Sequence, residues 1–176
     1  MSSTTYDIII VGGGLGGSAL AKAMAERGAS VLVLEKETRF RDRVRGEYME
    51  PWGVAEAKRL GIYETLIASG GHELRWWNSG ASSRDLPATT AQKVGALSFY
   101  HPYMQEGMSE AARQAGADVR RGATVRAIER GGMPAVVAQI DGQATRLHAR
   151  LVVAADGRGS RENGPASPSV RTPTVC

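Results

Sequence analysis

The chain is 176 residues long, which is the length of one domain or slightly more. Hydrophobic residues make up 42% and charged residues 23%, so the composition excludes a wholly disordered, collagenous or coiled-coil protein. The net charge of +4 is modest and the basic residues are spread along the chain, which argues against a nucleic-acid-binding surface.

The cysteine content and the apolar runs point to a soluble protein of a reducing compartment. Cys176 is the single cysteine, so internal disulfides and cysteine-based metal sites are excluded. The apolar run over 8–11 is far too short to span a bilayer, and we see no secretory signal. His72 and His148 have no partners at metal-ligand spacing. We therefore expect a cytoplasmic protein with no membrane span and no metal site.

The first residues predict a strand–helix–strand unit. Residues 6–11 form a short β-branched run that ends in glycines, which is typical of a buried parallel strand. A glycine-rich turn over 12–17 leads into a predicted helix over 18–27. Residues 31–34 predict a second buried strand, which ends at Glu35.

The middle of the chain predicts helices separated by short strands. Two helices are expected over 51–60 and 102–115, each with a proline in its first turn. Short strands are expected between residues 72 and 100 and over 118–121. Trp76 and Trp77 are adjacent on one of these strands, so we expect one in the core and one at the surface or in a pocket.

The last part of the chain predicts an antiparallel meander. Its strands are expected over 124–130, 135–140 and 144–150, with glycine-containing hairpin turns between them. A separate apolar strand over 151–155 follows. Residues 162–176 are rich in proline and lack periodicity, which predicts a disordered tail.

The glycine-rich turn carries the clearest chemical signal. Gly12, Gly14 and Gly17 satisfy G-x-G-x-x-G, and Glu35 closes the next strand about 20 residues later, as in dinucleotide-binding proteins. The glycines allow a tight turn, backbone approach to a pyrophosphate and close helix–strand packing, while the helix N-terminus attracts phosphate. Glu35 would accept hydrogen bonds from the ribose hydroxyls. The alternative is a glycine-rich turn with a solvated glutamate, and the motif alone does not choose between FAD and NAD.

Two further segments follow in order. The first is Arg45-Gly46-Glu47, with Pro51-Trp52-Gly53-Val54 after it, and the second runs Ala154-Ala155-Asp156-Gly157-Arg158-Gly159-Ser160. With the fingerprint, they resemble the N-terminal part of the class A flavoprotein monooxygenases, the p-hydroxybenzoate hydroxylase-like family. The resemblance implies a Rossmann-like, three-layer α/β FAD-binding domain over 1–161, with an inserted antiparallel β meander. The family's later segments have no counterpart here, so we expect the domain to be incomplete.

The resemblance also assigns roles to individual residues. Arg45 would reach FAD, and Asp156 would help to hold it. His101 stands where the family usually has Arg or Gln near the flavin, although a helix-start histidine without a cofactor role is equally compatible with the sequence. Val125 matches a position whose backbone meets the adenine, or it is simply a core valine. The complete predicted FAD site is Gly12, Gly14, Leu15, Gly16, Gly17, Glu35, Lys36, Arg45, His101, Val125, Asp156 and Gly157.

The function implied by the resemblance is that of an FAD-dependent oxidoreductase. We expect a monooxygenase that would hydroxylate a small organic substrate with NAD(P)H and O₂, in which the flavin performs the redox chemistry. A halogenase or a reductase shares the same front half. The alternatives are an NAD-linked dehydrogenase, which would explain neither Arg45-Gly46-Glu47 nor Asp156-Gly157, and an FAD-binding fragment without catalysis.

Overall fold

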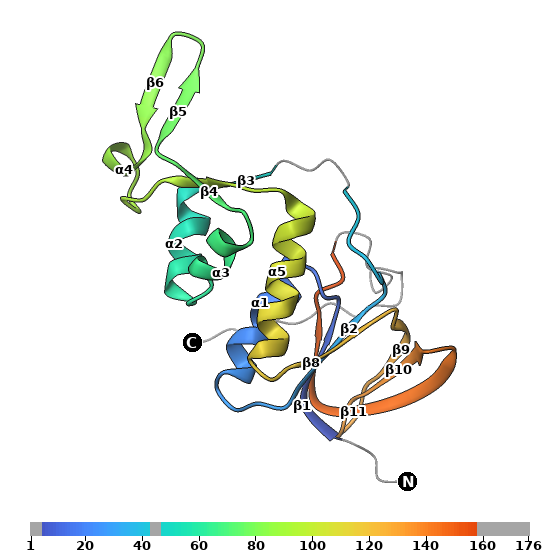
Figure 1. The fold of residues 1–176 in the computed structure, drawn as a ribbon. Helices are drawn as coiled ribbons and strands as arrows, with labels where there is room; N and C mark the ends of the chain where they lie inside the picture. The colour runs from blue at the N-terminus through green and yellow to red at the C-terminus, as the bar shows by residue number, and fades with distance from the viewer. Residues whose placement is uncertain (1–4, 43–46, 158–176) are drawn as a thin grey trace.

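The computed structural model describes residues 5–42 and 47–157 (Figure 1). Arg45 and the predicted tail over 162–176 lie outside these residues. The centre of the fold is a six-stranded sheet. In spatial order its strands are β8 (Asp118–Arg121), β2 (Val31–Glu35), β1 (Thr5–Val11), β11 (Gln143–Ala154), β10 (Ala135–Ile140) and β9 (Thr124–Glu129). The first four strands are mutually parallel, and β9, β10 and β11 form the antiparallel meander.

Strand β11 joins the two parts of the sheet, so the prediction of separate strands over 144–150 and 151–155 is wrong. Its first half pairs antiparallel with β10, and its second half pairs parallel with β1. His148 is the crossover position, because it stands opposite Ala135 on one side and Thr5 on the other. Residues 143–154 contain neither glycine nor proline, so nothing in the backbone interrupts the ladder.

Two helices, α1 (Leu15–Ala25) and α5 (His101–Gln114), lie side by side over one face of the parallel strands (Figure 1). Helix α1 begins at Leu15 rather than at residue 18, because packing on the sheet compensates for the poor helix propensity of its glycines. The contact buries residues of β1 and β2 together with small residues of both helices. These residues are Ile8, Ile10, Val31, Val33, Ala21 and Ala112.

The meander is part of the same sheet, and its side chains also pack against the face of β1 and β2 that the helices leave uncovered. Alternate residues of β1 and β2 point to that side, since side chains alternate along a strand. Ile9, Leu32 and Leu34 pack there against Val136 and Leu147 of the meander. Helices, parallel strands and meander therefore form three layers, and the predicted three-layer α/β fold with an antiparallel meander is confirmed.

A smaller unit packs on the far side of α5. It contains α2 (Pro51–Arg59), α3 (Tyr63–Ala68) and a three-stranded antiparallel sheet of β3 (Tyr48–Met49), β7 (Ala96–Ser98) and β4 (His72–Leu74). Helix α3 was not expected from the sequence. Met104 and Met108 of α5 enter its core beside Val54, Leu66 and Leu97. Helix α5 thus belongs to both cores and holds the two units together.

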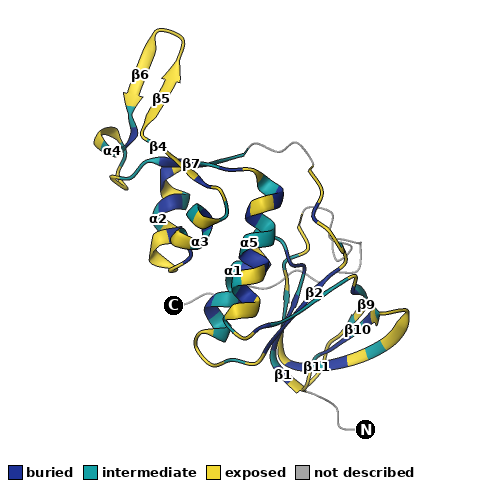
Figure 2. Ribbon diagram, viewed as in Figure 1, coloured by how far each residue is buried: buried dark blue, intermediate teal, exposed yellow. Residues whose placement is uncertain are grey.

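A hairpin of β5 (Trp76–Ser79) and β6 (Ser82–Asp85) extends away from the body, with a short helix, α4 (Leu86–Thr89), at its base (Figure 1). The hairpin is exposed along most of its length (Figure 2). Trp76 and Trp77 are 52% and 48% exposed, so the expectation that one lies in the core is wrong. The physical reason is that a two-stranded ribbon has no second layer to bury either face. Among the described residues, no helix is long and apolar enough to cross a membrane.

Candidate functional site

Three segments that are distant in sequence meet at the carboxyl edge of the parallel strands. The glycine-rich turn follows β1, Glu35 ends β2, and Asp156 follows β11. Backbone hydrogen bonds fix them together: Gly12 N–H donates to the Leu34 carbonyl (2.8 Å), and Ala155 N–H donates to the Val11 carbonyl (2.7 Å). Strand β1 lies between β2 and β11, so this edge is a switch point where open α/β sheets bind ligands.

Gly12 and Gly17 are glycines because the fold itself leaves no room for a side chain. Gly12 has φ +103°, and a Cβ there would lie 2.5 Å from the Ala155 carbonyl oxygen. A Cβ on Gly17 would lie 2.0 Å from the Gly12 carbonyl oxygen. Because both residues lack a side chain, α1 can start directly against the end of β1, and the turn can pack against the segment that carries Asp156.

Gly14 and Gly16 are different, because the described protein does not require glycine at either position. A Cβ on Gly14 would meet only Nε2 of Gln105, at an ordinary distance of 3.8 Å, and a Cβ on Gly16 would meet no described atom within 4 Å. Gly14 is the N-cap residue of α1, with an ordinary extended backbone (φ −67°) and no side-chain cap among the described residues. This bare surface at a helix N-terminus fits a phosphate group, which favours free N–H donors and the positive end of the helix.

Glu35 is buried, being only 7% exposed as a residue, and its carboxylate is held by the backbone. Oε2 accepts from Gly13 N–H at 2.6 Å, and Oε1 accepts from Glu37 N–H at 2.8 Å. The alternative of a solvated strand-end glutamate is therefore wrong. Each carboxylate oxygen keeps a further lone pair, so Glu35 can hold the turn and still accept a hydroxyl donor.

Gly13 and Ser18 were missed from the sequence, although both shape the turn. A Cβ on Gly13 would lie 2.9 Å from Cβ of Glu35, and the hydroxyl of Ser18, a buried residue of α1, donates to the Gly13 carbonyl (2.9 Å). Gly13 occupies an unspecified place in G-x-G-x-x-G, so the motif could not single it out.

Helix α5 brings His101 and Gln105 toward the glycine-rich turn. The backbone N–H of His101 donates to the Glu47 carboxylate (3.0 Å), and its ring Nδ1 lies 2.8 Å from Oε1 of Gln105. Gln105 in turn is the residue that reaches Gly14. Gln105 was missed from the sequence, and the only signal for it is its position one helical turn after His101.

Arg121, at the end of β8, connects the segment after β2 to α5. Its guanidinium pairs with Glu106 (2.6 Å), donates to the Glu37 carbonyl (3.2 Å), and lies 4.3 Å from the centre of the Phe40 ring. This residue was also missed, because its partners come from two elements that only the folded chain brings together.

The remaining predicted residues surround this edge in different ways. Lys36 is exposed beside Glu35, and Leu15 packs partly into the core of the smaller unit. Val125 is a partly buried residue packed against the meander core. Asp156 and Gly157 are exposed, and the Asp156 backbone adjoins Gly12.

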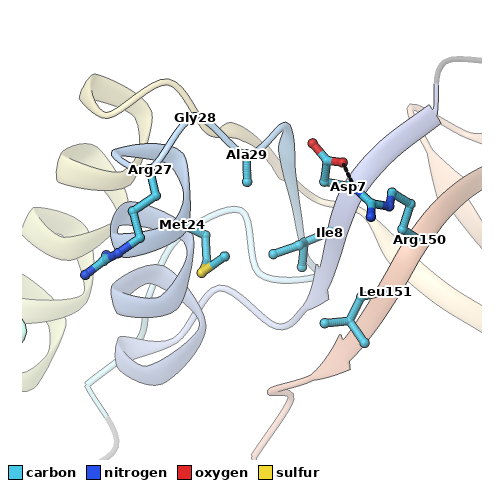
Figure 3. Close-up of a pocket in the computed structure, with 8 residues that line it drawn as sticks. All are labelled: Asp7, Ile8, Met24, Arg27, Gly28, Ala29, Arg150 and Leu151. Carbon is cyan, nitrogen blue, oxygen red and sulfur yellow. Dashed lines mark hydrogen bonds and ion pairs between the residues drawn. The ribbon is translucent and has the colours of Figure 1, made fainter.

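An open depression of about 520 Å³ lies at the other end of the strands (Figure 3). Its apolar lining includes Met24, Ala29 and Leu151, and a 3.1 Å ion pair between Asp7 and Arg150 borders it. Within residues 5–42 and 47–157, no group of His, Cys, Asp and Glu could hold a metal ion.

Comparison with known proteins identifies relatives of this chain. The sequence model of a family described as FAD binding domain matches residues 5–171. Squalene monooxygenase of Rattus norvegicus is 28% identical over 172 residues, which cover 91% of this chain and 30% of that protein. Squalene epoxidase 5 of Arabidopsis thaliana is 47% identical over 60 residues, which cover 34% of this chain and 12% of that protein.

Solved structures agree with this assignment. An anhydrotetracycline hydroxylase from Streptomyces rimosus has a TM-score of 0.73 and 25% identity, over 88% of this chain and 32% of that one. The myxobacterial chondrochloren halogenase has a TM-score of 0.73 and 27% identity, over 89% of this chain and 38% of that one. The chain spans less than half the length of each of these relatives. The resemblance to the class A flavoprotein monooxygenases is thereby confirmed, and the chain belongs to the FAD binding domain family.

Proposed function

We propose that this chain supplies the FAD-binding part of a flavoprotein monooxygenase that hydroxylates a small organic substrate with NAD(P)H and O₂. The observation that carries the proposal is the open face at Gly14. No packing among the described residues explains a glycine there, and Gly14 is the N-cap residue of α1, where no described side chain caps the helix. A bound diphosphate explains the missing side chain, because it needs close approach to the backbone.

The residues around this face have separate roles in the proposal. Backbone N–H groups at Leu15, Gly16 and Gly17 bind the diphosphate, and Glu35 accepts hydrogen bonds from the ribose hydroxyls. The segment of Ala155 and Asp156, which Gly157 follows, closes the other side of the turn, since it packs directly on Gly12. Lys36, Arg45, His101 and Val125 are proposed to make further contacts with FAD.

The bound FAD would supply the electron transfer and O₂ chemistry that protein side chains lack, while the protein orients it and excludes water. Relatives named as monooxygenase and hydroxylase support oxygen transfer to an organic substrate. One observation favours a second reaction, because a similar structure at 27% identity is an FAD-dependent halogenase. The family match over 5–171 weighs against an NAD-linked dehydrogenase.

The test is retention of flavin by the purified chain. The protein is mixed with FAD, passed over a desalting column, and examined for the visible absorption bands of oxidised flavin. We expect wild type to retain flavin and Gly14→Val to lose it, because the valine side chain would occupy the space of the diphosphate. Wild-type protein that retains no flavin and shows no FAD binding in a titration would overturn the proposal.

A further inference from the structure

We infer that the side-chain amide of Gln105 donates a hydrogen bond to the diphosphate of the bound dinucleotide, and that His101 positions this amide. The inference rests on the proposed function, since it concerns the same site. It adds a side-chain donor from α5 to the backbone donors of α1, so that two helices share one ligand.

The first observation is the position of Gln105. Its Nε2 lies 3.8 Å from where a Cβ of Gly14 would be, and no other described atom outside the turn lies within 4 Å of that point. Gln105 therefore borders a glycine face of the turn that the described residues leave open. A group at this place contacts any ligand that uses Gly14 for close approach.

The second observation is that the orientation of the amide is fixed. Oε1 of Gln105 lies 2.8 Å from Nδ1 of His101, and an amide oxygen can only accept, so Nδ1 carries the hydrogen. With Oε1 engaged, the NH₂ group is the end that remains for the turn. His101 is itself held, because its backbone N–H donates to the Glu47 carboxylate at 3.0 Å.

The chemistry of the two groups is complementary. A diphosphate accepts hydrogen bonds and carries negative charge, and hydrogen bonds to charged acceptors are stronger than those between neutral groups. Held in one orientation, the amide loses little side-chain entropy when the ligand binds. His101 acts through Gln105 in this arrangement, so it is a positioning residue.

The test replaces the donor by an acceptor of the same size. In Gln105→Glu, His101 can still donate to the side chain, but a carboxylate now faces the diphosphate. We expect FAD affinity, measured by titration, to fall about tenfold or more. The melting temperature without FAD should stay within about 3 °C of wild type. The matched control is Gln139→Glu on β10, where the same change faces Arg126 and should leave FAD affinity unchanged.

ADP as a competitor locates the contact, because it carries the diphosphate without the flavin. Gln105→Glu should weaken ADP binding by a factor similar to that for FAD. A loss confined to FAD would overturn the inference, as would an FAD affinity equal to wild type or a large fall in melting temperature. If wild type itself fails to bind FAD, the proposed function fails, whereas an unaffected Gln105→Glu protein removes only this inference.

The positioning role of His101 has its own readout. Asn can place an N–H near the position of Nδ1, so His101→Asn should keep most of the FAD affinity, whereas His101→Leu should lose it in part. In the Gln105→Leu background, the two His101 variants should bind FAD equally. A difference between them that persists in this background would show that His101 does not act through Gln105.

Discussion

The backbone N–H of Gly13 donates a 2.6 Å hydrogen bond to Oε2 of Glu35, which joins the turn after β1 to the last residue of β2. The same carboxylate accepts from Glu37 N–H through its other oxygen. Glu35 therefore organises the site before any ligand arrives, in addition to its proposed contact with the ribose.

Glu35→Gln should lower both stability and FAD affinity. Gly13 and Glu37 donate to different oxygens of Glu35, and an amide replaces one of these oxygens with NH₂, so one backbone N–H would face another donor. We expect the free energy of unfolding in urea, without FAD, to fall by about 1–3 kcal/mol. Glu129→Gln is the control, because it breaks only an exposed ion pair with Arg146. A variant as stable as wild type would show that the buried hydrogen bonds contribute little.

Alanine substitutions should separate the glycines required by the fold from the glycine required by the ligand. Gly12→Ala places a Cβ 2.5 Å from the Ala155 carbonyl oxygen at a positive φ, so we expect marked destabilisation. Gly14→Ala meets only ordinary contact, so it should unfold near the wild-type urea concentration yet bind FAD more weakly. Urea unfolding and FAD titration of both variants check this. Equal loss of stability in the two would contradict the distinction.

Arg121→Lys should destabilise the chain even though the charge is kept. Lysine cannot pair with Glu106, donate to the Glu37 carbonyl and cover the Phe40 ring at once, because it lacks the planar fork of arginine. We expect a loss of about 1–2 kcal/mol in urea unfolding, since Arg121 is only 16% exposed. Arg126→Lys, on an exposed face of the meander, should be nearly neutral. Equal effects of the two substitutions would remove the bridging role of Arg121.

Tyr6 should make stability depend on pH in the alkaline range. Burial, and then the 2.9 Å hydrogen bond to Asp118, raise the pKa of Tyr6 above its usual value of 10.0. A pKa raised by folding contributes stability below pH 10, and this stability is lost as pH rises through the folded pKa. In Tyr6→Phe we expect unfolding free energy to fall less steeply above this pH than in wild type, as measured by urea unfolding across the range. Identical slopes would contradict the assignment.

The local parts of this protein were determined by its sequence. Strands β1 and β2, the glycine-rich turn and Glu35 could be predicted because each depends on neighbours in the chain: a β-branched run, a bare backbone, and fixed spacing. The meander and α5 followed from hydrophobic periodicity and from turn residues for the same reason. Resemblance to a family supplied the cofactor, which periodicity alone could not.

Tertiary structure decided which of these residues meet. The hydrogen bond from Gly13 to Glu35 depends on β1 and β2 being adjacent and in register, and the approach of Gln105 to Gly14 depends on α5 packing against α1. The union of two predicted strands into β11 likewise required partners on both edges. Such contacts join residues far apart in sequence, and their distances are set by packing of the whole core, so no local pattern encodes them.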